Sequence, residues 1–260
     1  MTVRRSLQRL LPALLLSASV EVQAALSLTG TRLIFDGRYR EASLDVSNRG
    51  HDEVLAQAWL SDPRDDDDTP LAQRRTLPFV VTPPLSRLAA GGRQALRVLY
   101  QGAGMPQERE SLLHLYVLEV PQRHDGIRQL NIAVRQRINV FYRPVGLEGD
   151  PADTAERLNW TLTRREQGGL WLHVSNPTAY YASLERLNLD DMQVTGYVML
   201  APGARLEFPL PEREREHFWR RLSFEALTDY GGRRRFCAHP NGQSSFTASL
   251  LDNTSLQEKC

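Results

Sequence analysis

The feature that most constrains the fold is a succession of short β-strand patterns that begins at Ala25 and continues through most of the chain. The segments are rich in Val, Leu and aromatic residues and are bounded by Gly, Pro, Asn or Asp, which is typical of strands joined by turns. In the first half we expect strands at 42–48, 53–62, 94–101, 112–120 and 129–143. Strand patterns resume near residue 159, and little of the sequence has a helical period. The pattern predicts an all-β fold.

The length of 260 residues allows two domains of ordinary size, each with a hydrophobic core of its own. The segment 145–153, Val-Gly-Leu-Glu-Gly-Asp-Pro-Ala-Asp, has no strand pattern and is the candidate linker. We therefore expect an N-terminal domain over 25–145 and a C-terminal domain with a tail over 146–260.

Two short phrases recur in the same order in the two halves of the chain. Leu-Asp-Val-Ser-Asn at 44–48 resembles Leu-His-Val-Ser-Asn at 172–176. Leu-Ala-Ala-Gly-Gly-Arg at 88–93 resembles Leu-Ala-Pro-Gly-Ala-Arg at 200–205. Together with the linker, this echo favours two similar β-sandwiches in tandem.

The first 24 residues have the pattern of a secretory signal peptide. Arginines near the start are followed by an apolar run at 10–16, and small residues stand at Val22 and Ala24. The run is too short for a stable membrane span, and no later segment has about 18 apolar residues in a row. We expect the mature chain to begin at Ala25 and to have no membrane insertion after cleavage; a retained signal-anchor is the alternative.

Charge and motifs argue for a binding protein and against an enzyme. The 32 Lys and Arg nearly balance the 31 Asp and Glu, so no global field favours nucleic acid or an anionic membrane. The sequence contains no nucleophile elbow, zinc-protease motif, phosphate loop or Cys-x-x-Cys, and its six His lack metal-ligand spacing. The acidic run at 64–68 reads as a solvated loop and not as a calcium loop. We expect no metal and no cofactor.

The only two cysteines are Cys237 and Cys260. In an oxidising compartment they could form a disulfide, which would tether the C-terminal tail and not staple a core. Two unpaired thiols are the alternative, because the sequence does not say whether their Cα atoms come within bridging range.

The alternating row Leu130, Ile132 and Val134 has two interpretations. Side chains two residues apart share one face of a strand, so the row either faces the domain's own core or is offered to another chain. Taken alone, the pattern favours the ordinary core strand.

Eight blocks that occur in order along the mature chain, up to about residue 240, resemble the PapD-like periplasmic chaperones of the chaperone–usher pilus pathway. The blocks are ALSLTGTRLIFDG, LDVSN, LAQAWL, VTPPLSRLAAG, RESLLHLYVLEVP, INVFYRP, VSNPTAYY and LTDYGG. The resemblance implies two immunoglobulin-like β-sandwich domains in a boomerang arrangement, with a cleft between them.

The resemblance reverses the interpretation of the alternating row. In this family the chaperone lends a strand to an incomplete pilus subunit, and alternate apolar side chains fill the groove of the subunit. Leu130, Ile132 and Val134 match the donated row, and their spacing is the one that such an insertion requires.

The resemblance also implies a basic pair in the cleft that anchors the C-terminal carboxylate of the subunit. Arg32 matches the first member, and an arginine can hold a carboxylate through two hydrogen bonds. The second member is a lysine in the family, but Asn139 occupies its position here. Either Asn139 acts without charge, or Arg137 or Arg135 supplies the second cation; Arg137 is the better substitute because it shares a strand face with Asn139.

Two further implications concern the angle between the domains and the type of fibre. Glu110, Arg143 and Asp229 match an ionic network across the domain interface. The connection at 122–128 is short, which in the family accompanies chaperones of rod-like, adhesin-tipped pili.

The resemblance therefore implies a periplasmic chaperone that binds, folds and caps pilus subunits and delivers them to an outer-membrane usher, without ATP. The alternative is an exported immunoglobulin-like structural or adhesive protein, such as a fimbrial subunit or a surface lectin. A subunit should carry an N-terminal donor extension and an incomplete sandwich. Here strand patterns begin at once after the signal and the set of strands looks complete, which favours the chaperone.

Overall fold

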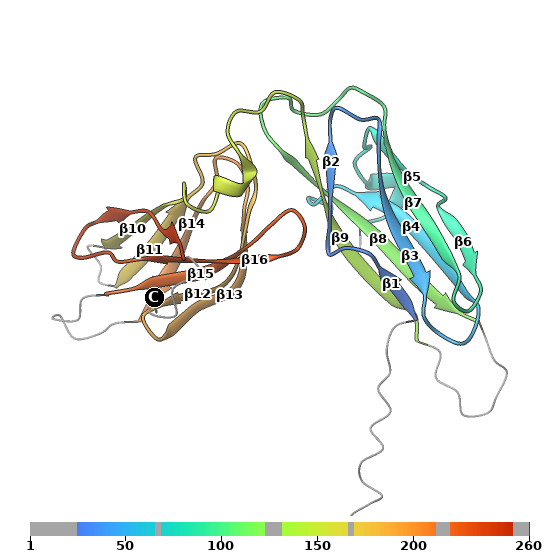
Figure 1. The fold of residues 1–260 in the computed structure, drawn as a ribbon. Helices are drawn as coiled ribbons and strands as arrows, with labels where there is room; N and C mark the ends of the chain where they lie inside the picture. The colour runs from blue at the N-terminus through green and yellow to red at the C-terminus, as the bar shows by residue number, and fades with distance from the viewer. Residues whose placement is uncertain (1–24, 66–68, 123–131, 166–168, 212–218, 252–259) are drawn as a thin grey trace, which may run out of the picture.

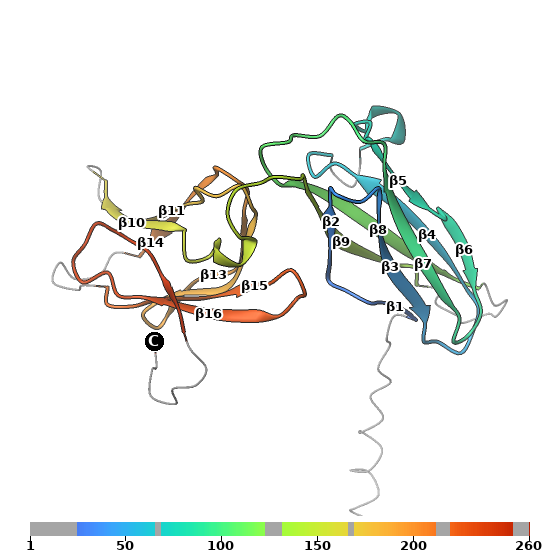
Figure 2. The same ribbon diagram turned by 45° about the horizontal axis from the view of Figure 1, so that its top comes forward.

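The computed structural model describes residues 25–65, 69–122, 132–165, 169–211, 219–251 and 260. The predicted signal peptide and Leu130 lie outside these residues. Figure 1 shows two β-lobes set at an angle and joined by the chain between strands β9 and β10, and Figure 2 shows the same lobes from a second direction. In the described part, the helical segments are two 3₁₀ turns, Leu71–Gln73 and Pro151–Asp153, and no helix is long and apolar enough to cross a membrane. The all-β prediction is confirmed.

The first lobe is a sandwich of two sheets. One sheet has the order β1-β3-β7-β5, with bounds Leu26–Leu28, Glu41–Asn48, Arg93–Tyr100 and Phe79–Thr82. The other has the order β2-β9-β8-β4-β6, with bounds Arg32–Asp36, Val134–Arg143, Ser111–Pro121, Val54–Ser61 and Leu85–Leu88. Alternate residues of both sheets fill the core, among them the fully buried Phe35, Val46, Leu115 and Val140.

The second lobe repeats this architecture. One sheet has the order β14-β11-β10-β17, with bounds Arg205–Leu210, Leu170–Ser175, Asn159–Arg164 and Ser245–Phe246. The other has the order β13-β12-β15-β16-β18, with bounds Met192–Leu200, Ala182–Leu189, Leu222–Leu227, Arg233–Ala238 and Ser249–Leu250. Its core is built around Trp160, Leu172, Leu184 and Phe236. Two separate cores explain why a chain of this length forms two sandwiches.

The recurring sequence segments contain a buried asparagine that forms the same kind of hydrogen bonds in each lobe, Asn48 in the first. Asn48 ends β3 and is buried, and its Nδ2 donates to the carbonyl oxygens of Asp52, Leu88 and Ala89 at 2.7, 3.0 and 3.1 Å. Leu88 and Ala89 open the second phrase of the pair. The asparagine amide therefore ties the end of one strand to the turn that precedes β7.

Asn176 does the same in the second lobe. It is equally buried, and its Nδ2 donates to the carbonyl oxygens of Tyr180, Leu200 and Ala201 at 2.7, 3.3 and 3.2 Å. Leu200 and Ala201 begin the matching phrase. The internal echo in the sequence thus reflects a buried asparagine amide that donates to three backbone carbonyls in each sandwich.

Replacing Asn176 by Ala should lower the free energy of unfolding of the second lobe by about 3 kcal/mol, because three backbone carbonyls lose the hydrogen bond from its buried amide. Urea unfolding followed by tryptophan fluorescence measures it, since three of the four tryptophans, Trp160, Trp171 and Trp219, lie in that lobe. Asn159→Ala, at an exposed position, is the matched control and should change little. Equal stabilities of the two variants would contradict the assigned role.

Candidate functional site

Strand β9 is paired along nearly its full length on one side and along half of its length on the other. β8 pairs with it antiparallel from Val134 to Tyr142. β2 pairs with it parallel, from the partners Arg32 and Asn139 onward. Among the described residues, the edge of β9 from Val134 to Ile138 therefore has no strand beside it. Unpaired backbone groups on such an edge can accept a strand from another chain.

The strand begins later than the sequence pattern predicts. We expected it to span 129–143, but within the described part it starts at Val134, and Ile132 and Ala133 precede it outside any ladder. The register pairs Val134 with Glu119, so continuing it would place Ile132 opposite Pro121, the last residue of β8. Proline has no N–H to donate to a ladder, which explains why the pairing stops there.

The alternating row becomes more exposed toward its start. Ile138 and Val140, later in the same alternation, are buried in the first core. Val134 is half-buried, and 49% of Ile132 is exposed. Leu130 lies outside the described residues. The part of the predicted donor row that the structure describes is thus incompletely buried by its own domain.

A groove of about 580 Å³ borders the open edge. It is lined by β1, by the segment 29–31 that connects β1 to β2, by Arg49, and by the β9 residues Gln136, Arg137 and Ile138. The first strand switches sheets here, because β1 pairs with β3 whereas β2 pairs with β9. Gln136 Nε2 donates to the carbonyl oxygen of Leu26 at 2.8 Å and holds the two segments together. The switch leaves room beside β9 until β2 joins it at Asn139.

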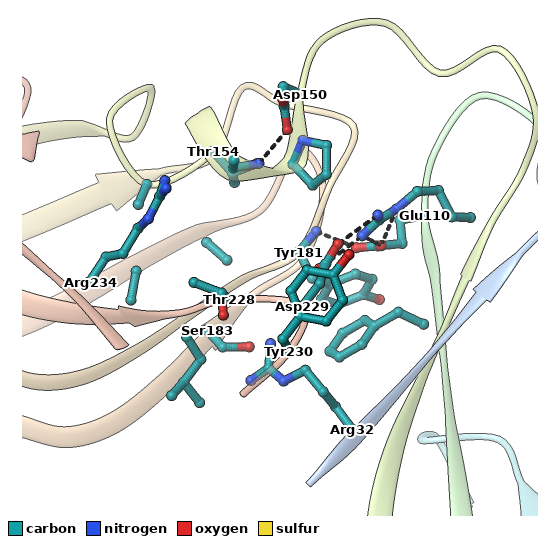
Figure 3. A pocket seen from close by; sticks show the side chains of 18 of the residues that line it. Arg32, Glu110, Asp150, Thr154, Tyr181, Ser183, Thr228, Asp229, Tyr230 and Arg234 are labelled. Carbon is teal, nitrogen blue, oxygen red and sulfur yellow. Dashed lines mark hydrogen bonds and ion pairs between the residues drawn. The ribbon is translucent and has the colours of Figure 1, made fainter. Parts of the chain in front are cut away.

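A cavity of about 350 Å³ lies between the two lobes, where the open edge ends (Figure 3). Arg32 extends into it from β2, with its guanidinium carbon 5.6 Å from the ring centre of Phe141. Burial lowers the pKa of Arg32, partly offset by the nearby acidic groups of Tyr197 and Asp229. Its Nε is buried without a hydrogen-bond partner, and it forms no ion pair with any residue that the structure describes.

The predicted second anchors do not line this cavity. Asn139 lies beside Arg32 in register, but its Nδ2 faces Met199 Sδ of the second lobe at 4.0 Å. Arg137 is exposed and lines the groove along β9. Arg135 stacks on Tyr116, 5.3 Å from the ring centre. The preference for Arg137 as the second cation in the cleft is therefore not supported by its position.

The structure instead brings a serine to the cavity that sequence reasoning missed. Ser183 lies on β12 of the second lobe and is only 3% exposed, and its Oγ has no hydrogen-bond partner among the described residues. Thr154, which lines the same cavity, also has a buried Oγ1 without a hydrogen-bond partner in the described part of the chain. Figure 3 shows the guanidinium of Arg32 pointing toward the wall that carries Ser183. A single serine in a strand of mixed composition belongs to no motif, so only the fold reveals it.

Glu110, Arg143 and Asp229 meet across the domain interface. Arg143 Nη2 donates to Glu110 Oε1 at 2.8 Å, and its Nη1 donates to Asp229 Oδ2 at 2.8 Å. Glu110 is buried, and its Oε2 accepts from the backbone N–H of Tyr181, in the second lobe, at 2.8 Å. Both lobes are thus held by one cation and two carboxylates.

The pKa values follow from this arrangement. Burial opposes the charge of Arg143, but its hydrogen bonds to Asp229 and the charge of Glu110 outweigh that effect and raise its pKa. Burial raises the pKa of Glu110, against the opposing charge of Arg143. Arg143 is therefore neutralised by its neighbours, whereas Arg32, in the same cavity, has no ion-pair partner among the residues that the structure describes.

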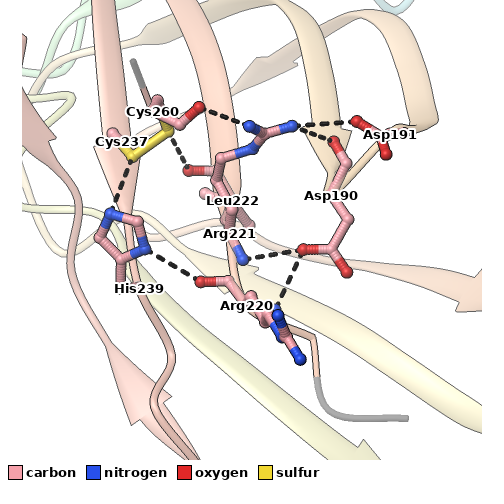
Figure 4. Close-up of a disulfide and its surroundings, with 8 residues drawn as sticks. All are labelled: Asp190, Asp191, Arg220, Arg221, Leu222, Cys237, His239 and Cys260. Atoms are coloured by element: carbon pink, nitrogen blue, oxygen red, sulfur yellow. Dashed lines mark hydrogen bonds and ion pairs between the residues drawn. A yellow bond between two sulfur atoms is a disulfide. The ribbon is translucent and has the colours of Figure 1, made fainter. Parts of the chain in front are cut away.

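The two cysteines form a disulfide in the second lobe (Figure 4). Cys237 and Cys260 have an S–S distance of 1.98 Å and a Cα–Cα distance of 5.6 Å. Arg221 Nη1 donates to the carbonyl oxygen of Cys260 at 2.5 Å. The bridge ties Cys260 to β16, and neither cysteine is among the described residues that line the cavity.

Comparison with known proteins agrees with this architecture. Residues 25–148 match the family model for the pili and flagellar-assembly chaperone, PapD N-terminal domain, and residues 153–238 match that for the PapD C-terminal domain. The chaperone protein FimB/FhaD of Bordetella pertussis is 34% identical over 230 residues, which cover 85% of this chain and 90% of that protein.

Solved structures share the fold. The CupB2 chaperone of Pseudomonas aeruginosa has a TM-score of 0.65 and 34% identity, covering 82% of this chain and 99% of that one. The SafB chaperone of Salmonella enterica, solved in complex with the SafA pilin, gives a TM-score of 0.67 and 26% identity over 88% of this chain and 97% of that one. The chain belongs to the family of PapD-like pilus-assembly chaperones.

Proposed function

We propose that this chaperone acts in the periplasm, captures pilus subunits by lending them the open edge of β9, and delivers them to an outer-membrane usher. One observation carries the proposal: the half-paired stretch of β9, flanked by the exposed Ile132, ends at an arginine with an unpaired charge. A pilin in complex with the related SafB chaperone supports a subunit as the partner.

Capture proceeds by strand addition. A subunit strand that pairs with Val134–Ile138 satisfies backbone groups on both chains. The row Leu130, Ile132 and Val134 fills the open core of the subunit, since residues two apart point into the same groove. Each inserted side chain contributes about 1.5–3 kcal/mol by burial, before the ordering costs of association are subtracted.

The position of β2 determines the direction of the added strand. β2 occupies the edge of β9 from Asn139 onward, so an added strand must stop where β2 begins. Only a strand that runs parallel to β9 arrives at this point with its C-terminus. Its terminal carboxylate then meets Arg32, the first residue of β2, in the cavity between the lobes.

In this proposal, Ser183 takes the place of the missing second cation. The carboxylate accepts hydrogen bonds from the guanidinium of Arg32 and from the hydroxyl of Ser183. Arg32 Nε and Ser183 Oγ are both buried and have no hydrogen-bond partner among the described residues. A hydrogen bond to a charged group is stronger than one between neutral groups, so a hydroxyl in a buried cavity is an effective second donor. The anchor thereby engages both lobes, whose relative orientation Arg143 fixes.

Replacing Ile132 by Asp should abolish subunit capture while leaving the chaperone folded, because the side chain is exposed in the free protein. Co-purification from cells that express the chaperone with a pilus subunit measures capture, and thermal unfolding measures the fold. Leu85→Asp is the matched control: Leu85 is 55% exposed and lies on β6, at the opposite edge of the same sheet. If capture survives Ile132→Asp, or if Leu85→Asp also abolishes it, the assignment of β9 and Ile132 to subunit capture is wrong.

Replacing Ser183 by Ala should weaken subunit binding about tenfold, since one hydrogen bond to a charged group is lost. Adding increasing amounts of each chaperone variant to a refolding pilus subunit, and measuring the fraction of subunit bound, gives the relative affinities. Ser86 provides the control, because its Oγ is also buried and unpartnered but lies on β6, away from the cavity. An unchanged affinity for Ser183→Ala would show that the carboxylate is anchored without the second lobe.

A further inference from the structure

Glu119 is a buried carboxylate near the start of the donor edge. It lies on β8, is 6% exposed, and stands opposite Val134 in the register of β8 and β9. Its Oε1 accepts from the backbone nitrogen of Ala25 at 3.2 Å, and its Oε2 accepts from that of Leu26 at 2.9 Å. No arginine, lysine or histidine side chain among the described residues forms an ion pair with it. Among the described residues, two backbone N–H groups are thus the hydrogen-bond donors to this carboxylate.

A buried carboxylate without a cation is unfavourable, because desolvation penalises the charged form. The nitrogen that Glu119 already contacts is that of Ala25, the residue after the predicted signal-peptide cleavage site. Hydrolysis of the peptide bond between Ala24 and Ala25 adds one water, which leaves a carboxylate on the signal peptide and an amine on Ala25. An α-amino group has a pKa of about 8 and is therefore mostly protonated at neutral pH.

We propose that signal-peptide removal creates the missing cation, and that the new α-ammonium of Ala25 pairs with Glu119 inside the folded first lobe. The pairing needs no rearrangement, since the nitrogen already lies within hydrogen-bond distance of the carboxylate. A charged donor replaces a neutral one at the same place, which strengthens the contact.

The pair affects the donor edge. Ala25 and Leu26 are also held by the backbone N–H of Arg49, which donates to Ala25 O at 2.7 Å, and by Gln136 of β9, which donates to Leu26 O. The ammonium therefore ties the first strand, which pairs with β3 of the other sheet, to Glu119 of β8, next to its contact with Gln136 of β9. Cleavage of the signal peptide completes the electrostatics of the capture site, so an unprocessed chain has a looser edge.

The test compares the free and the acetylated N-terminus. A protein released from a fusion with Ala25 as its first residue is acetylated with acetic anhydride. Lys259 is the only lysine in the sequence, so a Lys259→Arg background confines the reaction to the α-amine. Acetylation keeps the N–H of Ala25 but removes its charge. Hydrogen exchange at pH 7 of the segment Leu26–Leu28 is the readout, with β10 of the second lobe as the internal reference.

Acetylation should accelerate exchange at Leu26–Leu28 about tenfold and leave β10 unchanged, as expected for the loss of one charged hydrogen bond. In a Glu119→Gln background, acetylation should not change the exchange rate, because the pairing requires both the α-ammonium of Ala25 and the carboxylate of Glu119. If Glu119→Gln does not fold, Glu119→Asp replaces it and should show a reduced effect. Equal exchange before and after acetylation, or an effect that persists undiminished without the glutamate, would overturn the pairing.

Discussion

Strand β9 has a free side over Val134–Ile138 because β2 joins the sheet no earlier than Asn139. An exposed edge normally invites aggregation, and natural proteins blunt it with charged side chains. Arg135 and Arg137, on the outer face of this stretch, are exposed and provide that protection. The proposed function thus requires an edge that stays open in the free protein and accepts a strand from a subunit whose apolar groove fits the row Leu130, Ile132 and Val134.

The cavity between the lobes lies at the end of the open edge of β9. Two arginines lie there in opposite electrostatic states: Arg143 is neutralised by Glu110 and Asp229, whereas Arg32 lacks an ion-pair partner in the described part of the chain. The first pairing fixes the orientation of the two lobes, although its net stabilisation is small. Arg32 places a positive charge where, in the proposed function, an added strand parallel to β9 terminates. Orientation and attraction are thus assigned to different residues of one cavity.

The sequence indicated most of the first lobe, because alternation and turn residues act locally. The strands expected at 42–48, 94–101 and 112–120 lie within one residue of β3, β7 and β8 at each end. The start of β9 was missed because Pro121, on its neighbour, determines where pairing ends. Ser183 was missed because its proposed role depends on how the two lobes meet, and a local sequence pattern does not indicate that arrangement. Arg32 and the network around Arg143 were located through the family resemblance and not through any spacing.

The most direct measurement is residue-resolved hydrogen exchange of β9 in the free chaperone and in its complex with a pilus subunit. Strand addition at the open edge predicts strong new protection for the outward-facing amides of Val134–Ile138, with little change on β6 at the opposite edge of the sheet. A stable complex in which those amides exchange as fast as in the free protein would contradict the assignment of β9 as the donor strand.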